Sequence, residues 1–84
     1  MVSGPAGMHA LVRLDLDDAL VEVSGPVGRT DVPALLDVVA RAQRIEPDLV
    51  VDVSAADVTA EALADLGAAA RAGAGPCRPF ALRT

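Results

Sequence analysis

The sequence contains no tryptophan, tyrosine, lysine or asparagine, and only one phenylalanine, one histidine and one cysteine. A single cysteine, Cys77, excludes an internal disulfide and a zinc site built from several cysteines, and it fits a reducing, cytoplasmic location. His9 has no set of convergent ligands near it in the sequence, so we expect no metal site and no cofactor. Cys77 is expected to be a small, partly buried residue, and His9 a solvent-facing residue of a strand.

Basic residues are also scarce, with seven arginines against twelve acidic residues and a net charge of -5. The arginines are scattered from Arg13 to Arg83 without forming a stripe, which argues against nucleic acid as a partner. No stretch approaches the roughly 18 apolar residues of a membrane span, so no membrane insertion is expected. Residues 1–7 lack the regions of a signal peptide and are expected to form a disordered leader, before a single domain over residues 8–84.

The most apolar run lies at residues 49–53, between Pro47 and Ser54. It is too short for a buried helix and too continuously apolar for a half-exposed strand, so it predicts an inner strand of a sheet. Such a strand needs neighbours on both edges and a helix across at least one face. Asp52 interrupts the run, and no histidine or lysine in this half of the chain could complement it in catalysis. We expect the Asp52 carboxylate to accept a structural hydrogen bond.

The flanking patterns predict the remaining elements. Strands are expected at residues 10–16 and 20–23, a helix from about residue 32 to 45, a second helix at residues 59–72, and a last edge strand at residues 78–82. Residues 25–31 and 54–58 are expected to be loops, with Asp31 or Thr30 capping the first helix. The sequence therefore predicts an α/β fold: a small mixed β-sheet with element order β-β-α-β-α-β and helices on one face.

The second predicted helix has clear signals at both ends. Thr59 is a good N-cap residue, and Gly73 follows the last turn as a C-terminal cap. Gly67 in the middle of this helix indicates close packing at that position. The face expected to contact the sheet carries Leu63, Leu66 and Ala70.

Residues 24–36 (SGPVGRTDVPALL) and 49–54 (LVVDVS), together with the amino-terminal hairpin, resemble the STAS domain of bacterial anti-sigma factor antagonists over residues 10–82. The resemblance implies a non-catalytic regulatory domain that acts in transcription regulation by binding a protein partner. That partner would be an anti-sigma factor of the kinase type or another sigma regulator. The resemblance places the partner-binding surface at Gly28, Arg29, Thr30, Asp31, Ser54, Asp57, Thr59 and Glu61.

In that family an Asp-Ser-x-Gly motif opens the second helix, and its serine is phosphorylated by the partner kinase. This chain has no such serine. An ungapped register puts Glu61 at its place, whereas a loop one residue shorter puts Ala60 there and Thr59 at the aspartate. The second register is preferred because Leu63 and Leu66 would then face the sheet. In both registers serine phosphorylation cannot be the switch, and Thr59, the only nearby hydroxyl, is interpreted as an N-cap more readily than as a phosphoacceptor.

Two alternatives remain open at this point. STAS-like chains also serve as accessory subunits of lipid-transport assemblies, where the domain stabilises an ATPase, so a structural role in a transport assembly is the alternative function. The family also usually continues into a further helix after the last strand, but this sequence stops at Thr84. Either another chain supplies that helix, which includes a homodimer, or the domain is a reduced relative with a poorly covered sheet face. A hydrolase or a nucleotide site is not expected, because no catalytic constellation or P-loop spacing is present.

Overall fold

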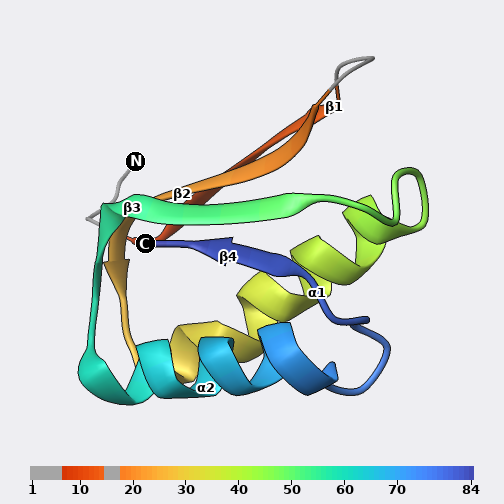
Figure 1. Ribbon diagram of the computed structural model, residues 1–84. Coiled ribbons are helices and arrows are strands. Elements are labelled where there is room, and N and C mark those ends of the chain that lie inside the picture. The colour runs from red at the N-terminus through yellow and green to blue at the C-terminus, as the bar shows by residue number, and fades with distance from the viewer. Residues whose placement is uncertain (1–6, 15–17) are drawn as a thin grey trace.

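The computed structural model describes residues 7–14 and 18–84 (Figure 1). Its elements are β1 (His9–Leu14), β2 (Ala19–Val27), the short 3-10 helix η1 (Arg29–Asp31), α1 (Val32–Gln43), β3 (Val50–Val58), α2 (Ala60–Ala72) and β4 (Ala81–Arg83). The predicted order β-β-α-β-α-β is confirmed. The expectations for residues 1–6 of the leader, for the end of the first strand at residues 15–16 and for the turn at Asp17 lie outside the described residues.

β3 lies inside the four-stranded sheet, as the apolar run predicted. The strand order is β1-β2-β3-β4, with β1 antiparallel to β2, and β2, β3 and β4 mutually parallel. The parallel pairing of β2 with β3 follows from the helical connection between them, because α1 carries the chain back to the starting end of the sheet. β4 lies at the sheet edge, as predicted, but it covers Ala81–Arg83 and not residues 78–82, because Pro79 has no N–H to donate to a neighbouring strand.

Both helices cover one face of the sheet (Figure 1). Val21 pairs with Val51, and both side chains are fully buried against the helical layer. Leu35 of α1 and Leu66 of α2 are also completely buried, so the two helices and the sheet share one core. Burial of aliphatic side chains of this size contributes about 1.5–3 kcal/mol each. Among the described residues, no helix combines the length and apolar content needed to cross a bilayer.

β2 and β3 are longer than the sequence predicted. Residues 25–27 and 54–58 were expected to be loops, but they continue the strands and pair in parallel from Ser24–Ala55 to Val27–Val58, after a bulge between Glu22 and Ser24. The prediction was wrong because glycine, proline and alanine have low strand propensity, whereas pairing with a neighbouring strand overrides such preferences. Gly25 is required here, since its φ is +81° and a Cβ atom would lie 2.6 Å from the Gly7 carbonyl oxygen.

The face that α2 turns to the sheet was predicted correctly for Leu66 and Ala70 but not for Leu63. Its buried residues are Ala62, Leu66 and Ala69, whereas Leu63 is 39% exposed. The prediction for Leu63 was wrong because Ala62 and Leu63 are neighbours, and either one fits the helical spacing of the buried face. The small Ala62 lets the helix approach the sheet closely, whereas a leucine at that place would not. The expectation of close packing at Gly67 was also wrong, since a Cβ atom there would meet only the Arg71 guanidinium, at 3.5 Å.

The predicted caps of α2 are present. The Thr59 hydroxyl oxygen accepts a hydrogen bond from the Ala62 backbone N–H at 3.2 Å, and Gly73 follows the helix with a φ of +79°. α1 is different, because Asp31 occupies the capping position but its carboxylate accepts from the Gly28 N–H at 2.8 Å instead of from the helix. α1 also ends at Gln43, before the predicted end near Ile45.

The segment after α2 is held by Gln43, the one buried polar side chain of the described core. Its amide nitrogen donates to the Arg78 carbonyl at 2.8 Å, and its amide oxygen accepts from the Arg78 N–H at 2.9 Å. These two hydrogen bonds satisfy the backbone N–H and C=O of Arg78, as a neighbouring strand would do in a sheet. Cys77, beside it, is buried as a small residue of the same turn, and its burial was correctly expected.

We predict that Gln43→Ala lowers the free energy of unfolding by about 2–3 kcal/mol, because the Arg78 backbone loses both partners in a buried setting. Urea denaturation followed by circular dichroism measures this change. Arg44→Ala, at the exposed neighbouring position, is the control and should change stability by less than about 0.5 kcal/mol. Equal stability of the Gln43→Ala variant and the wild type would contradict the role assigned to the two hydrogen bonds.

Candidate functional site

The extended pairing of β2 with β3 brings the loop after β2 beside the start of α2. Val27 pairs with Val58 at the ends of the two strands, and the Thr59 N–H donates to the Val27 carbonyl at 3.0 Å. Residues 28–31 therefore lie next to the first turn of α2, as Figure 1 shows at the end of the molecule where both helices begin. The structure thus brings together most of the partner-binding residues that the sequence resemblance suggested.

The loop itself has an ordered internal geometry. η1 is closed by the bond from the Gly28 N–H to Asp31 and by the bond from the Asp31 N–H to the Gly28 carbonyl at 2.9 Å. Thr30 at its tip is exposed. Arg29 reaches α2, where its Nε lies 3.3 Å from an Asp65 carboxylate oxygen. Because both side chains are largely exposed, this ion pair contributes at most about 1 kcal/mol.

Asp65 was expected to be an ordinary solvated charge, and its pairing with the loop was not predicted. Arg29 and Asp65 are 36 positions apart in the sequence, so no local pattern links them. Only the helical period of α2 gives a signal, because Glu61 and Asp65 are four residues apart and share one side of the helix. The pair connects the loop and the helix across the surface.

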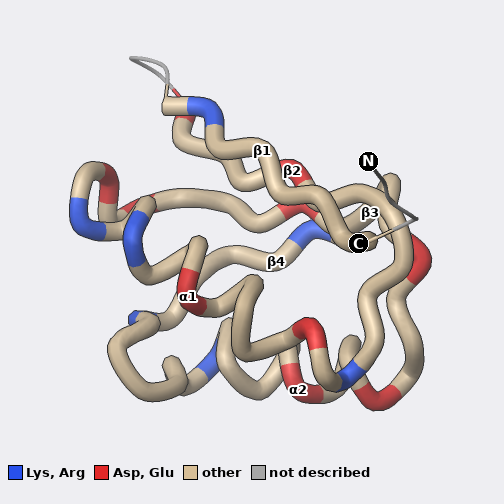
Figure 2. The backbone as a smooth tube through the Cα atoms, turned by 180° about the vertical axis from the view of Figure 1, so that it is seen from behind, with Lys and Arg blue, Asp and Glu red and all other residues tan. Residues whose placement is uncertain are grey.

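The surface at this end is acidic. Asp57 and Glu61 are exposed, and they lie near Asp31 and Asp65, whereas Arg29 is the basic residue among them. Four carboxylates against one guanidinium give a formal charge of -3. Figure 2 shows acidic segments gathered around the start of α2 and on the strand that leads into it. A partner with arginine or lysine on its contacting face complements this charge.

An apolar groove runs between α1 and α2, next to the acidic surface. It is open, has a volume of about 500 Å³, and carries Arg29 and Asp65 on its rim. The apolar side chains that line it are Val32, Pro33, Leu36, Ala68, Ala69 and Ala72. The many alanines of α2 leave this space between the helices, since methyl groups do not fill it. The sequence signal was the alanine content, but the position of the groove needs the structure.

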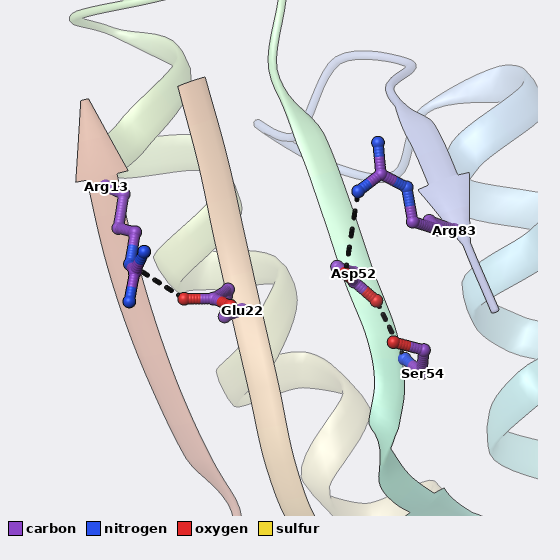
Figure 3. Close-up of polar contacts among 5 residues, drawn as sticks. All are labelled: Arg13, Glu22, Asp52, Ser54 and Arg83. Atoms are coloured by element: carbon purple, nitrogen blue, oxygen red, sulfur yellow. Dashed lines mark hydrogen bonds and ion pairs between the residues drawn. The ribbon is translucent and has the colours of Figure 1, made fainter. Parts of the chain in front are cut away.

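Ser54, the remaining predicted partner-binding residue, is not part of this group. It lies on β3 four residues before Val58, about 13 Å away along an extended strand. Its backbone N–H donates to the Asp52 carboxylate at 2.9 Å, and the Arg83 guanidinium approaches the same carboxylate at 3.7 Å (Figure 3). The structural hydrogen bond expected at Asp52 is therefore present, and it joins two residues of the same strand.

The uncovered face of the sheet carries this polar group and a second ion pair. Arg13 of β1 lies 2.8 Å from Glu22 of β2, on the same face as Asp52 and Arg83 (Figure 3). Hydrogen bonds from the Ser54 hydroxyl and backbone lower the pKa of Asp52, and the positive charge of Arg83 adds to this effect. The poorly covered face suggested by the sequence is thus interrupted by charged pairs and is not continuously apolar.

The described residues offer little catalytic or metal chemistry. Within residues 7–14 and 18–84, the His, Cys, Asp and Glu side chains form no group of three that could hold a metal ion. Burial raises the pKa of the Cys77 thiol, which disfavours the reactive thiolate. His9 is exposed on β1, as predicted. The geometry is that of a binding surface made of backbone turns, exposed charges and an apolar groove.

The order and pairing of the elements are those of a STAS-like domain, a class of regulatory protein-binding domain. No protein-family model matches the sequence, and no curated protein does. A solved structure does match: an anti-sigma factor antagonist from Mycobacterium paratuberculosis superposes with a TM-score of 0.67 and 26% sequence identity. The match covers 96% of this chain and 70% of that chain. The resemblance inferred from the sequence is therefore confirmed by the structure.

We predict that the Asp52 carboxyl titrates below its ordinary range near pH 4, and that Ser54→Ala raises its midpoint more than Arg83→Gln does. The Ser54 hydroxyl is the larger of the two causes, which sets the order. Carbonyl NMR of the carboxyl group across a pH titration measures each midpoint. An Asp52 midpoint at or above the ordinary value in the wild type would contradict the hydrogen-bonding arrangement.

The lowered pKa of Asp52 determines how the stability of the fold depends on pH. Because the folded-state pKa is lowered, the ionised carboxylate stabilises the fold fully above about pH 4. This stabilisation is lost as the pH falls through the lowered pKa. The stability difference between wild type and Asp52→Asn should therefore shrink in acid and stay constant near neutral pH.

Proposed function

We propose that this protein is a non-catalytic regulatory domain of the anti-sigma factor antagonist type, and that it binds an anti-sigma factor through the surface where β2 and β3 end. The single observation that carries this proposal is the structural match to an anti-sigma factor antagonist over nearly the whole chain. A cytoplasmic location, expected from the lone cysteine, belongs to the same proposal.

The proposed contact surface consists of residues 28–31, Asp57, Thr59 and Glu61, together with Asp65 and the groove between α1 and α2. Support comes from the hydrogen bond between Thr59 and Val27 and from the Arg29–Asp65 ion pair, which fix the loop and the helix relative to each other. A surface that is already ordered loses less conformational entropy on binding. Ser54 is left out of the surface because of its distance along β3.

The proposed partner face is basic at its rim and apolar at its centre. The formal charge of -3 on residues 29, 31, 57, 61 and 65 favours arginine or lysine at the rim, whereas the groove favours an aliphatic or aromatic side chain. Charges that remain solvated in a complex mainly increase the association rate and are screened by salt. Binding is therefore expected to weaken as the salt concentration rises.

We further propose that binding is independent of serine phosphorylation. The first turn of α2 reads Thr59, Ala60, Glu61 and Ala62, and the nearest serine before it is Ser54 on β3. The premise that favoured Ala60 over Glu61 as the counterpart of the family's serine was that Leu63 and Leu66 both face the sheet. Leu66 is buried but Leu63 is exposed, so the premise holds for only one of the two leucines. A fixed Glu61 carries one negative charge where a phosphoserine carries nearly two, and a fixed Ala60 carries none.

We predict that Glu61→Arg weakens partner binding about tenfold or more, because it replaces an attractive charge with a repulsive one on the proposed surface. The partner is first captured from extract of the native cells with the tagged wild-type protein and identified by mass spectrometry. Calorimetry with the purified partner then gives the affinities of wild type and variant.

Glu46→Arg is the matched control, since Glu46 is an exposed glutamate in the connection at the opposite end of β3. Its affinity should equal that of the wild type. Capture of an anti-sigma factor supports the proposal, whereas capture of a transport ATPase would replace it with the accessory-subunit function. Equal affinities of the two variants would refute the proposed surface.

We predict that the protein gains no phosphate when it is incubated with ATP and the captured partner. The Thr59 hydroxyl oxygen is already engaged as the cap of α2, and the described part of the helix offers no serine. Intact mass spectrometry measures the outcome directly, with Thr59→Val as the control for any modification found. A mass increase that disappears in Thr59→Val would show that Thr59 is a phosphoacceptor and would contradict constitutive binding.

A further inference from the structure

Five large apolar side chains are exposed in the described residues, and three of them lie together: Val12 and Leu14 of β1, and Ile45, which follows α1. Leu11 lies on the opposite face of β1, and Leu63 belongs to α2. Val12, Leu14 and Ile45 also line an open groove of about 280 Å³ between β1 and α1, together with Val38, Arg41 and Ala42. Ile45 is 71% exposed, so this patch is apolar surface in contact with water.

β1 is also an edge strand, because within residues 7–14 and 18–84 it pairs with β2 alone. An edge strand presents backbone N–H and C=O groups on its outer side that can pair with another strand. Proteins usually protect such edges with bulges, prolines or charges. β1 pairs with β2 in regular register over all six residues, contains no proline, and has one charged residue, Arg13, which is bound to Glu22 of its own sheet (Figure 3). The opposite edge, β4, has only three residues and offers little to pair with.

The sequence of β1 is suited to antiparallel pairing with itself. If a two-fold axis passes beside Val12, then Val12 faces Val12 of the second copy and Ala10 faces Leu14. All these side chains lie on the face that bears the groove, since residues two apart share a face. Arg13 then faces Leu11 on the opposite face, so no like charges meet. A shift that places Leu11 on the axis instead puts Arg13 opposite His9, which is less favourable.

We propose that a second copy of this chain docks on β1, with the two β1 strands antiparallel about Val12, and forms a dimer with a continuous eight-stranded sheet. The dimer covers Val12, Leu14 and Ile45 of both copies. A contact along six residues buries less surface than a standard interface of roughly 1,600 Å². We therefore expect a weak dimer with a dissociation constant in the micromolar to millimolar range, so that its population depends on protein concentration. This proposal does not rest on the proposed regulatory function.

Sedimentation velocity over a concentration series tests the dimer. We expect wild type to shift from monomer to dimer as its concentration rises, and Val12→Lys and Val12→Glu each to weaken dimerisation at least tenfold, because like charges would face each other at the axis. An equimolar mixture of the two variants should restore the dimer, since the mixed pair is attractive. Leu63→Lys, at an equally exposed leucine of α2, should dimerise as wild type does.

A cross-linking measurement covers the case in which a charged variant fails to fold. Val12→Cys should form an interchain disulfide on oxidation, because directly facing strand residues lie within disulfide reach, whereas Leu63→Cys should not. A wild type that stays monomeric at millimolar concentration would overturn the proposal. A dimer unaffected by Val12→Lys, a mixture that stays monomeric, or loss of the dimer in Leu63→Lys would each overturn it as well.

Discussion

The parallel pairing of β2 with β3 determines both the core and the candidate site, because it continues past the part of the sheet that the helices cover. Up to Glu22–Asp52 the two strands form the middle of the sheet and bury Val21 and Val51 under the helices. After the bulge they continue as a two-stranded ribbon to Val27–Val58, which delivers the chain to the starts of η1 and α2 at the same place. The pairing of these two strands thus forms the centre of the sheet and also determines the position of the proposed contact surface.

The elements with strong local signals could be predicted from sequence. The run at residues 49–53, the Thr59 cap and the Gly73 end of α2 each follow from local chemistry, and all three are present. The paired segments at residues 25–27 and 54–58 could not be predicted, because neither has strand propensity of its own. Each becomes a strand through its hydrogen bonds to the other segment. The burial of Leu63 was predicted wrongly for a related reason: Ala62 and Leu63 are both apolar, and the space between helix and sheet, not the helical period, decides that the alanine is buried.

Contacts between distant residues set the other limit on prediction. Gln43 holds the Arg78 backbone, and Arg29 holds Asp65, across 35 and 36 positions of sequence. Nothing around either residue signals its partner, because a glutamine in a helix and an aspartate on an exposed face are both common. The resemblance therefore named a loop and a helix start that lie side by side in the structure, and their role in binding stays a prediction. It did not indicate Asp65 or the groove between the helices, and it included Ser54, which lies apart on β3.

The two proposed interaction surfaces lie at opposite ends of α1. Arg29 precedes this helix and Ile45 follows it, and the twelve residues of α1 span about 18 Å. A dimer formed through β1 would therefore leave both acidic surfaces free, and the two-fold axis would present two copies of the contact site. When one site of the dimer binds a dimeric partner, the second site faces a raised effective concentration of that partner. A weak dimer would therefore bind such a partner more tightly without adding a contact at either site. Because the β1 dimer depends on protein concentration, such regulation would follow the amount of this protein in the cell, which suits a domain whose helix start has no phosphorylatable serine.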